Sequence, residues 1–291
     1  MKNIPMVRSN PILMIFISAI LLLGIDNQSF AQEYKIKTIV IDAGHGGRDG
    51  NTRGLYSAEK DVALKTALRL GKLIEDNLKD VKVVYTRTTD VFIPLYERIG
   101  LANTVKADLF ISIHCNDMPV YTTRYISGYT RKKGKKVPIY KYRSAKSTST
   151  RGTETFVSGT GRINEQDDAI KRENASIFLE DNYKENYEGF NPDDPESAII
   201  LSLMKNTFRT QSLKLAKFVQ DEYVKVGRIN RGVQEKSLAV LARAGMPAIL
   251  TEIGFISNPP EEDYMNSEAG QIEITECLLK AIQAYKASVE I

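Results

Sequence analysis

The chain has only two histidines, His45 and His114, and they occupy equivalent positions in two predicted strands. Each follows an apolar run typical of a buried strand, Thr38-Ile-Val-Ile-Asp-Ala-Gly before His45 and Asp108-Leu-Phe-Ile-Ser-Ile before His114. Sites of open α/β sheets form at the carboxyl ends of strands, and imidazole is the commonest metal ligand in proteins. We therefore favour a shared metal site over two unrelated histidines that satisfy local hydrogen bonds.

A third metal ligand is expected near the same edge, because a catalytic zinc site takes three protein ligands and keeps a fourth position for water. Glu59 is the candidate, although an acid in the first turn of a helix would equally oppose the helix dipole. Glycines at positions 44, 46 and 47 let the backbone turn sharply close to a metal. Asp42 is either a hydrogen-bond partner of a ligand histidine or an ordinary strand-end acid.

A general base is expected in the apolar run Leu250-Thr-Glu-Ile-Gly-Phe-Ile-Ser-Asn258. A buried carboxylate such as Glu252 costs free energy unless it is paired or used, and a metallohydrolase needs a base to accept a proton from water. Burial would raise the pKa of Glu252 and a nearby dication would lower it, so the sequence leaves the balance open. Glu154 is either a structural acid bound to backbone amides or a residue that supports the site or contacts the substrate.

Predicted strands and helices alternate along the chain, and this pattern is typical of an α/β fold. Strands are expected over 36–42, 81–87, 108–114, 152–158, 237–241 and 247–253. Helices are expected over 58–76, 94–105, 197–226 and 267–289. The alternation predicts a single domain with a mostly parallel twisted sheet and helices on both faces.

Two polar segments interrupt this pattern. Residues 121–151 hold ten Lys or Arg and no acid, and we predict an exposed surface loop there. Residues 161–196 form an acidic insert that ends at Asn191-Pro-Asp-Asp-Pro195, and the stretch 165–187 is a possible helix.

Residues 1–31 are predicted to be a secretory signal peptide. A basic start with Lys2 and Arg8 precedes an apolar core, and Ala31 ends a segment suited to cleavage before Gln32. The core is short for a membrane span, and a retained N-terminal anchor is the alternative. We therefore expect an exported domain over 32–291, with no membrane span after cleavage.

The net charge and the cysteine content further restrict the partners and the covalent bonds to be expected of the protein. A net charge of +4 is too mild to indicate nucleic acid as a partner. Two cysteines, Cys115 and Cys277, would allow one disulfide, but nothing in their spacing supports it. We expect both to be buried, reduced, small hydrophobic residues.

These motifs together resemble the zinc-dependent N-acetylmuramoyl-L-alanine amidases of the cell-separation and autolysin type. The matching segments are Val40-Ile-Asp-Ala-Gly-His-Gly-Gly47, Glu59, Ser112-Ile-His-Cys-Asn116, Arg151-Gly-Thr-Glu-Thr-Phe156 and the run that contains Glu252. The resemblance implies one Zn²⁺ per chain, held by His45, Glu59 and His114, with Glu252 as the catalytic acid/base. It also implies peptidoglycan as substrate, cleaved between the lactyl group of N-acetylmuramic acid and L-alanine.

The chain departs from this family at Cys115, where a small apolar residue is usual, and in the long basic segment after Pro119. Asn116 is either an extra donor to the substrate or a turn-capping residue. Two other functions stay open on the residues alone. One is a zinc peptidase that cuts within stem peptides, and the other is a non-catalytic cell-wall binding protein.

Relatives that act in cell separation often carry an inserted helix that covers the zinc cleft until a protein activator displaces it. The matching position here is 161–196. Its acids are Glu165, Asp167, Asp168, Glu173, Glu180, Asp181, Glu185 and Glu188. A carboxylate of this insert could fill the open zinc position, and Glu180 is the candidate because the preceding stretch 175–179 is apolar and could dock on the cleft. The polarity of the insert equally suits a mobile surface lid.

Overall fold

The computed structural model describes residues 35–50, 52–159, 167–181 and 195–290, so the predicted signal peptide lies outside the described residues. Its centre is a six-stranded sheet in the order β2-β1-β3-β8-β6-β7. The strands are β1 (Thr38–Ala43), β2 (Lys82–Tyr85), β3 (Leu109–Asn116), β6 (Thr153–Ser158), β7 (Asn230–Lys236) and β8 (Ala248–Phe255). Neighbours are parallel except β6 and β8, which confirms the predicted mostly parallel sheet.

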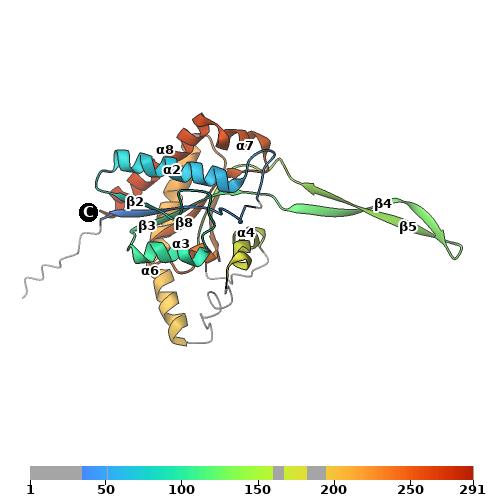
Figure 1. Ribbon diagram of the computed structural model, residues 1–291, viewed down its shortest axis with the longest axis horizontal. Coiled ribbons are helices and arrows are strands. Elements are labelled where there is room, and N and C mark those ends of the chain that lie inside the picture. Colours follow the sequence, from blue (N-terminus) through green and yellow to red (C-terminus); the bar gives the residue numbers. More distant parts are fainter. Residues whose placement is uncertain (1–34, 51, 160–166, 182–194, 291) are drawn as a thin grey trace, which may run out of the picture. The chain divides into compact units, whose positions relative to one another are not determined.

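Helices cover both faces of this sheet (Figure 1). Successive side chains of a strand point to opposite faces, so Ile39 and Ile41 of β1 join one core and Val40 joins the other. The first core packs against α2 (Glu59–Asn77), α6 (Pro195–Lys225) and α8 (Glu268–Val289). The second contains residues of α3 (Leu95–Thr104), α4 (Asp168–Glu173) and the 3-10 turns η1 (Ala175–Leu179) and η2 (Ala239–Leu241). Helix α7 (Pro259–Asn266) follows β8.

The edge strand β7 is missing from the sequence prediction, which placed a strand over 237–241 instead. That prediction is wrong, because the apolar residues of 237–241 include the 3-10 turn η2, which packs in the second core. Strand β7 reads Asn-Arg-Gly-Val-Gln-Glu-Lys and is at most half buried, so it lacks the apolar run that marks an inner strand. It pairs in parallel with β6.

The segment 121–151 is not the loop that its charge suggested. It forms a long antiparallel hairpin of β4 (Val120–Lys132) and β5 (Lys135–Lys146), which is a sheet of its own (Figure 1). The prediction failed because it weighed charge above the many β-branched and tyrosine residues, which favour strands. The turn residues Lys133 and Gly134 have φ values of 50° and 76°, as a two-residue hairpin turn requires.

The acidic insert is described only in part. Within it, α4 and η1 replace the single helix considered for 165–187. Among the described residues, no helix is long and apolar enough to cross a membrane. Cys115 and Cys277 are both buried and unbonded to each other, which confirms the expectation of two reduced cysteines.

A buried ion pair fixes the carboxyl end of β1. Arg98 of α3 donates to Asp42 Oδ1 at 3.0 Å and to the carbonyls of Ala43 at 2.9 Å and His45 at 2.8 Å. Asp42 also accepts hydrogen bonds from the hydroxyls of Ser112 and Thr86, both at 2.6 Å. Arg98 and Asp42 are almost completely buried, so each depends on the other for its counter-charge.

Arg98→Leu is therefore expected to lower the free energy of unfolding by about 3–5 kcal/mol, because it leaves the Asp42 carboxylate buried without a cation. Urea denaturation measures this loss. Arg69→Leu is the matched control, since Arg69 pairs with Glu268 at the surface and should cost less than about 1 kcal/mol. Equal losses in the two variants would contradict the anchoring role of Arg98.

Candidate metal centre

The turn after β1 brings His45 to the edge of the sheet. His45 has a φ of 58°, which is uncommon for a residue with a side chain, and Gly46 and Gly47 follow with φ values of 128° and 56°. Gly44 allows the close approach of the second histidine, because a Cβ at this position would lie 2.5 Å from the His114 ring. Asp49 Oδ2 lies 2.9 Å from His45 Nδ1 and orients the ring so that Nε2 is left for a ligand.

Four buried side chains converge at this point. Glu59, the first residue of α2, places Oε1 at 3.1 Å from His114 Nδ1 and Oε2 at 3.2 Å from His45 Nε2. Glu173 of α4 places Oε2 at 2.8 Å from His114 Nδ1 and 3.7 Å from His45 Nε2. One ligand atom from each residue lies within 4.8 Å of the others. The structure thus brings together the three ligands predicted from the sequence and adds a fourth.

The charges of these groups reinforce one another. Burial would lower the pKa of both imidazoles, but the Glu59 and Glu173 carboxylates outweigh it, raising the pKa of His45 well above its ordinary range and that of His114 to about 10. Burial would raise the pKa of both carboxyl groups, but the two imidazoles hold the pKa of Glu59 well below its ordinary value. His114 and Arg172 likewise lower the pKa of Glu173 to about 2.

The donor set fits a bound zinc ion. His45 Nε2, Glu59 Oε2 and Glu173 Oε2 are buried and have no hydrogen-bond partner, although nearly all such atoms in proteins are paired. Imidazole nitrogens and carboxylate oxygens are also the ligands that zinc takes in catalytic sites. The cluster can therefore hold a metal ion.

Glu252 lies on the next strand of the sheet. It pairs in register with His114, so the two side chains point to the same face, and it is fully buried. Arg172 Nη2 donates to its Oε1 at 3.1 Å, whereas its Oε2 has no hydrogen-bond partner. Burial and the Glu173 charge raise the pKa of Glu252 to about 8, although Arg172 opposes this shift. A carboxyl group of this kind can hold or release a proton near neutral pH.

The acid that the insert places beside the histidines is Glu173, not Glu180 as expected from the sequence. Helix α4 begins at its cap Asp167 and buries Ile170 in the second core, so Glu173, one turn later, points the same way. Glu180 instead accepts a hydrogen bond at 2.7 Å from the backbone N–H of Leu95, the first residue of α3. The spacing of Ile170 and Glu173 was the available signal, and the apolar stretch before Glu180 misled the prediction.

The remaining predicted residues lie around this centre. Asp42 makes no hydrogen bond to either imidazole among the described contacts. The partner of His45 is Asp49, which the sequence analysis missed although it lies only four residues further along the chain. Asn116 Nδ2 donates to Glu154 Oε2 at 3.0 Å. Glu154 pairs in register with Glu252 and accepts a hydrogen bond at 2.5 Å from Arg231 of β7. A polar row thus runs from β3 to β7 along one edge of the sheet.

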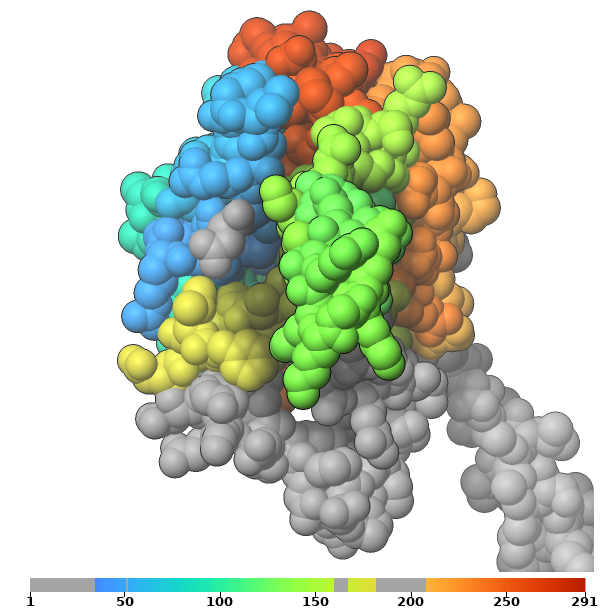
Figure 2. Space-filling model, turned by 90° about the vertical axis from the view of Figure 1, so that its right-hand side faces the viewer, coloured from blue at the N-terminus to red at the C-terminus, as the bar shows by residue number. Residues whose placement is uncertain are grey.

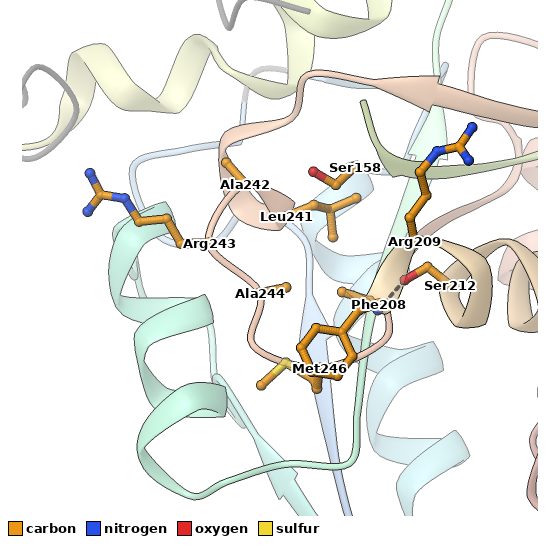
Figure 3. A pocket seen from close by; sticks show the side chains of 10 residues that line it. Ser158, Phe208, Arg209, Ser212, Leu241, Ala242, Arg243, Ala244 and Met246 are labelled. Atoms are coloured by element: carbon orange, nitrogen blue, oxygen red, sulfur yellow. Dashed lines mark hydrogen bonds between the residues drawn. The ribbon is translucent and has the colours of Figure 1, made fainter. Parts of the chain in front are cut away.

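A separate hollow lies at the opposite end of β8, whose first residue, Ala248, is part of its wall (Figure 3). It encloses about 400 Å³, open solvent included, and the side chains of Phe208, Leu241 and Met246 line it with two arginines. No histidine or acid contributes to its lining, so it offers no metal ligand.

Two imidazoles, a carboxylate and a further buried glutamate at the strand ends of an α/β sheet form a centre that could hold a metal ion beside an acid/base, an arrangement that metal-dependent hydrolases use. The sequence profile of N-acetylmuramoyl-L-alanine amidase matches residues 39–284. The chain belongs to this family.

Individual relatives agree with this assignment. N-acetylmuramoyl-L-alanine amidase AmiC of Escherichia coli O6:H1 is 32% identical over 252 residues, which cover 86% of this chain and 52% of that protein. The chain thus spans about half the length of this relative. The crystal structure of the amidase from Clostridium difficile 630 matches with a TM-score of 0.58 and 26% identity, covering 88% of this chain and 99% of that one. The CwlD amidase from Clostridioides difficile, solved in complex with the GerS lipoprotein, shares the fold with a TM-score of 0.55 and 22% identity, covering 87% and 99%.

Gly44→Ala is expected to weaken metal binding by about 10- to 100-fold, because the added methyl group displaces the His114 ring. Competition with a chromogenic zinc chelator measures the affinity. Gly100→Ala is the control, since a Cβ there would meet nothing within 4 Å. Unchanged zinc affinity in folded Gly44→Ala protein would exclude this packing as a determinant of the site.

Proposed function

We propose that the chain hydrolyses the amide bond between N-acetylmuramic acid and L-alanine in peptidoglycan, with one Zn²⁺ held by His45, Glu59 and His114. The observation that carries this proposal is the convergence of three buried ligand atoms beside Glu252. Membership of the amidase family supports the choice of bond. A zinc peptidase would need the same centre, and a non-catalytic binding protein would not need to keep all four residues.

Zinc, when bound, supplies a Lewis acid for the scissile carbonyl and lowers the pKa of water. Glu252 accepts a proton from the attacking water and delivers it to the leaving alanine nitrogen as the carbon–nitrogen bond breaks. Glu59 is fixed for its role by the backbone N–H of Cys115, which donates to Oε1 at 2.9 Å. Asp49 holds the His45 ring, so both ligands are positioned in advance.

Asn116 and Glu154 are proposed to contact the substrate beyond Glu252. Both are buried under the rim of the site and bound to each other, and Arg231 extends the row to β7. Polar side chains on three different strands provide donors and acceptors for a chain that carries amides and carboxylates. Asp42 acts further back, because it holds Arg98 and through it the carbonyl of His45.

The described conformation is proposed to be inhibited. Two adjacent residues of α4 engage both halves of the centre, since Glu173 contacts the histidines and Arg172 binds Glu252. Glu173 thereby takes the position that a catalytic zinc site leaves open. We propose that the insert 161–196 covers the site until a protein activator displaces it. The CwlD–GerS complex supports a protein partner for this fold.

We further propose that the chain acts outside the cytoplasm, in the periplasm or bound to the cell wall, in wall remodelling or daughter-cell separation. The predicted signal peptide at 1–31 and the catalytic domain at 32–291 suit export, because the substrate lies beyond the membrane.

Glu252→Gln is expected to keep one zinc per chain and to lose roughly 100- to 10,000-fold in turnover, because an amide keeps the shape but accepts no proton. His114→Ala is the contrasting variant and should lose both zinc and activity. Zinc content and mass spectrometry of the products from purified sacculi measure the two effects.

The products of the Arg172→Ala/Glu173→Ala protein, in which the proposed inhibitory contacts are removed, should be intact stem peptides that begin with L-alanine, together with unbroken glycan strands. Shorter peptides would identify a stem-peptide peptidase instead. Loss of zinc in Glu252→Gln with activity retained would contradict the assigned role.

The double substitution Arg172→Ala with Glu173→Ala is expected to raise basal hydrolysis of sacculi at least tenfold, because it frees both the zinc position and Glu252. Deletion of 167–191 should have the same effect. Asp168→Ala with Lys171→Ala is the matched control, since both side chains are exposed on the same helix. Unchanged or lower activity in folded, zinc-loaded protein would refute inhibition by this segment.

A further inference from the structure

The β4–β5 hairpin carries exposed apolar and aromatic surface that no part of the described chain covers. Tyr125, Tyr129 and Tyr142 are 48%, 54% and 69% exposed, and Ile126 between them is 49% exposed. An isolated two-stranded hairpin is only marginally stable in water, and exposed apolar surface of this kind marks interaction sites. The hairpin therefore has the character of a binding element.

The charge of the hairpin specifies an anionic partner. Residues 120–146 contain nine Lys or Arg and no acid, more positive charge than the net +4 of the whole chain. Within the described residues, Lys146 alone among them forms an ion pair, with Asp117 at 2.7 Å. The tip, Lys132-Lys133-Gly134-Lys135-Lys136, is entirely basic apart from the turn glycine. Such a tip is unsuited to insertion into a membrane.

The strand register places cations and tyrosines on both faces. Arg124 pairs with Tyr142 on one face, where its guanidinium also lies 4.2 Å from the centre of the Tyr140 ring. Tyr125 pairs with Lys141 on the other face. A globular protein partner would bind one face, whereas two similar faces suit a polymer that contacts the hairpin from several sides.

The hairpin is also attached at the candidate metal centre. Strand β4 begins six residues after His114, and Asp117 at its root binds Lys146 through its side chain. The carbonyl of Asp117 accepts a hydrogen bond at 3.1 Å from Arg172 of α4. Figure 2 shows the hairpin on the same face of the molecule as the α4 segment. A polymer held along the hairpin would therefore come close to the site at the root of the hairpin.

We propose that the β4–β5 hairpin is a binding arm for the peptidoglycan polymer. Its lysines and arginines bind the free carboxylates of the stem peptides, and its tyrosines pack against the sugar rings. This proposal rests on the proposed function for the identity of the polymer. Binding at the arm raises the local concentration of scissile bonds at the neighbouring site, as a second binding element does in a bivalent ligand.

Binding is tested without turnover in the Glu252→Gln background, by co-sedimentation with purified sacculi at low and high salt. The arm variant is K132S/K133S/K135S/K136S, and the control is K72S/K82S/K217S/K280S, which removes four exposed lysines elsewhere. The arm variant should bind at least tenfold more weakly at low salt and respond less to salt, because charge attraction is screened. The control should bind like the parent, and unaltered binding by the arm variant would overturn the proposal.

The aromatic contribution is tested with Y129S/Y140S/Y142S in the same background. Its affinity should fall several-fold at both salt concentrations, because packing against sugars is not screened. Equal affinity to the parent would exclude the tyrosines from the binding surface. Thermal unfolding and zinc content should match the parent in all these variants, since the hairpin lies outside both cores.

Activity and vesicle binding separate the remaining explanations. With an active centre, the arm variant should cleave a soluble muramoyl peptide at the wild-type rate and sacculi more slowly. Arg172→Ala/Glu173→Ala protein, in which the proposed inhibitory contacts are removed, would defeat the proposed function if it were folded and zinc-loaded and cleaved neither substrate, while the sedimentation result would still decide the arm. Hairpin-dependent binding to phosphatidylglycerol vesicles, with none to sacculi, would overturn the proposal in favour of a membrane surface.

Discussion

The close contact of two imidazoles and two carboxylates in a buried space is the interaction on which the described arrangement of the site depends. His45, His114, Glu59 and Glu173 are each at most 6% exposed, so none can rely on water for its charge. Three of them are held by a further contact from the protein: Asp49 holds His45, the Cys115 amide holds Glu59, and Arg172 holds Glu173. The turn that begins at His45, the Arg98–Asp42 ion pair and the start of α2 at Glu59 hold these side chains close together.

The architecture explains how residues distant in sequence meet at this point. Strands β1, β3 and β8 are parallel and end at the same edge, which delivers His45, His114 and Glu252 from their carboxyl ends. Strand β6 runs the other way beside β8, so Glu154 reaches the same edge from near the start of its strand. Sites of open α/β sheets normally take their residues from the carboxyl ends of parallel strands. This site also takes an acid from the antiparallel strand β6.

The sequence predicted those elements whose residues are constrained by burial. The strand before each histidine is a continuous apolar run, and Glu252 stands out because a charge is rare in such a run. The elements that were not predicted owe their structure to their place in the fold and not to a local apolar pattern. Strand β7 is polar because it is an edge, and the hairpin is basic because both of its faces are exposed. The choice of Glu173 over Glu180 depends on how α4 packs, and its only local signal is the spacing of Ile170 and Glu173, which the apolar stretch before Glu180 outweighed in the prediction.

Asp117 contacts both the β4–β5 hairpin and helix α4, each through a different part of the residue. Its carboxylate holds the root of the hairpin through Lys146, whereas its main-chain carbonyl holds Arg172. A main-chain carbonyl is kept in any substitution. Replacing the Asp117 side chain therefore removes the ion pair that holds the root of the hairpin while the acceptor for Arg172 stays in the chain, so the hairpin and α4 are attached to this residue by separable contacts.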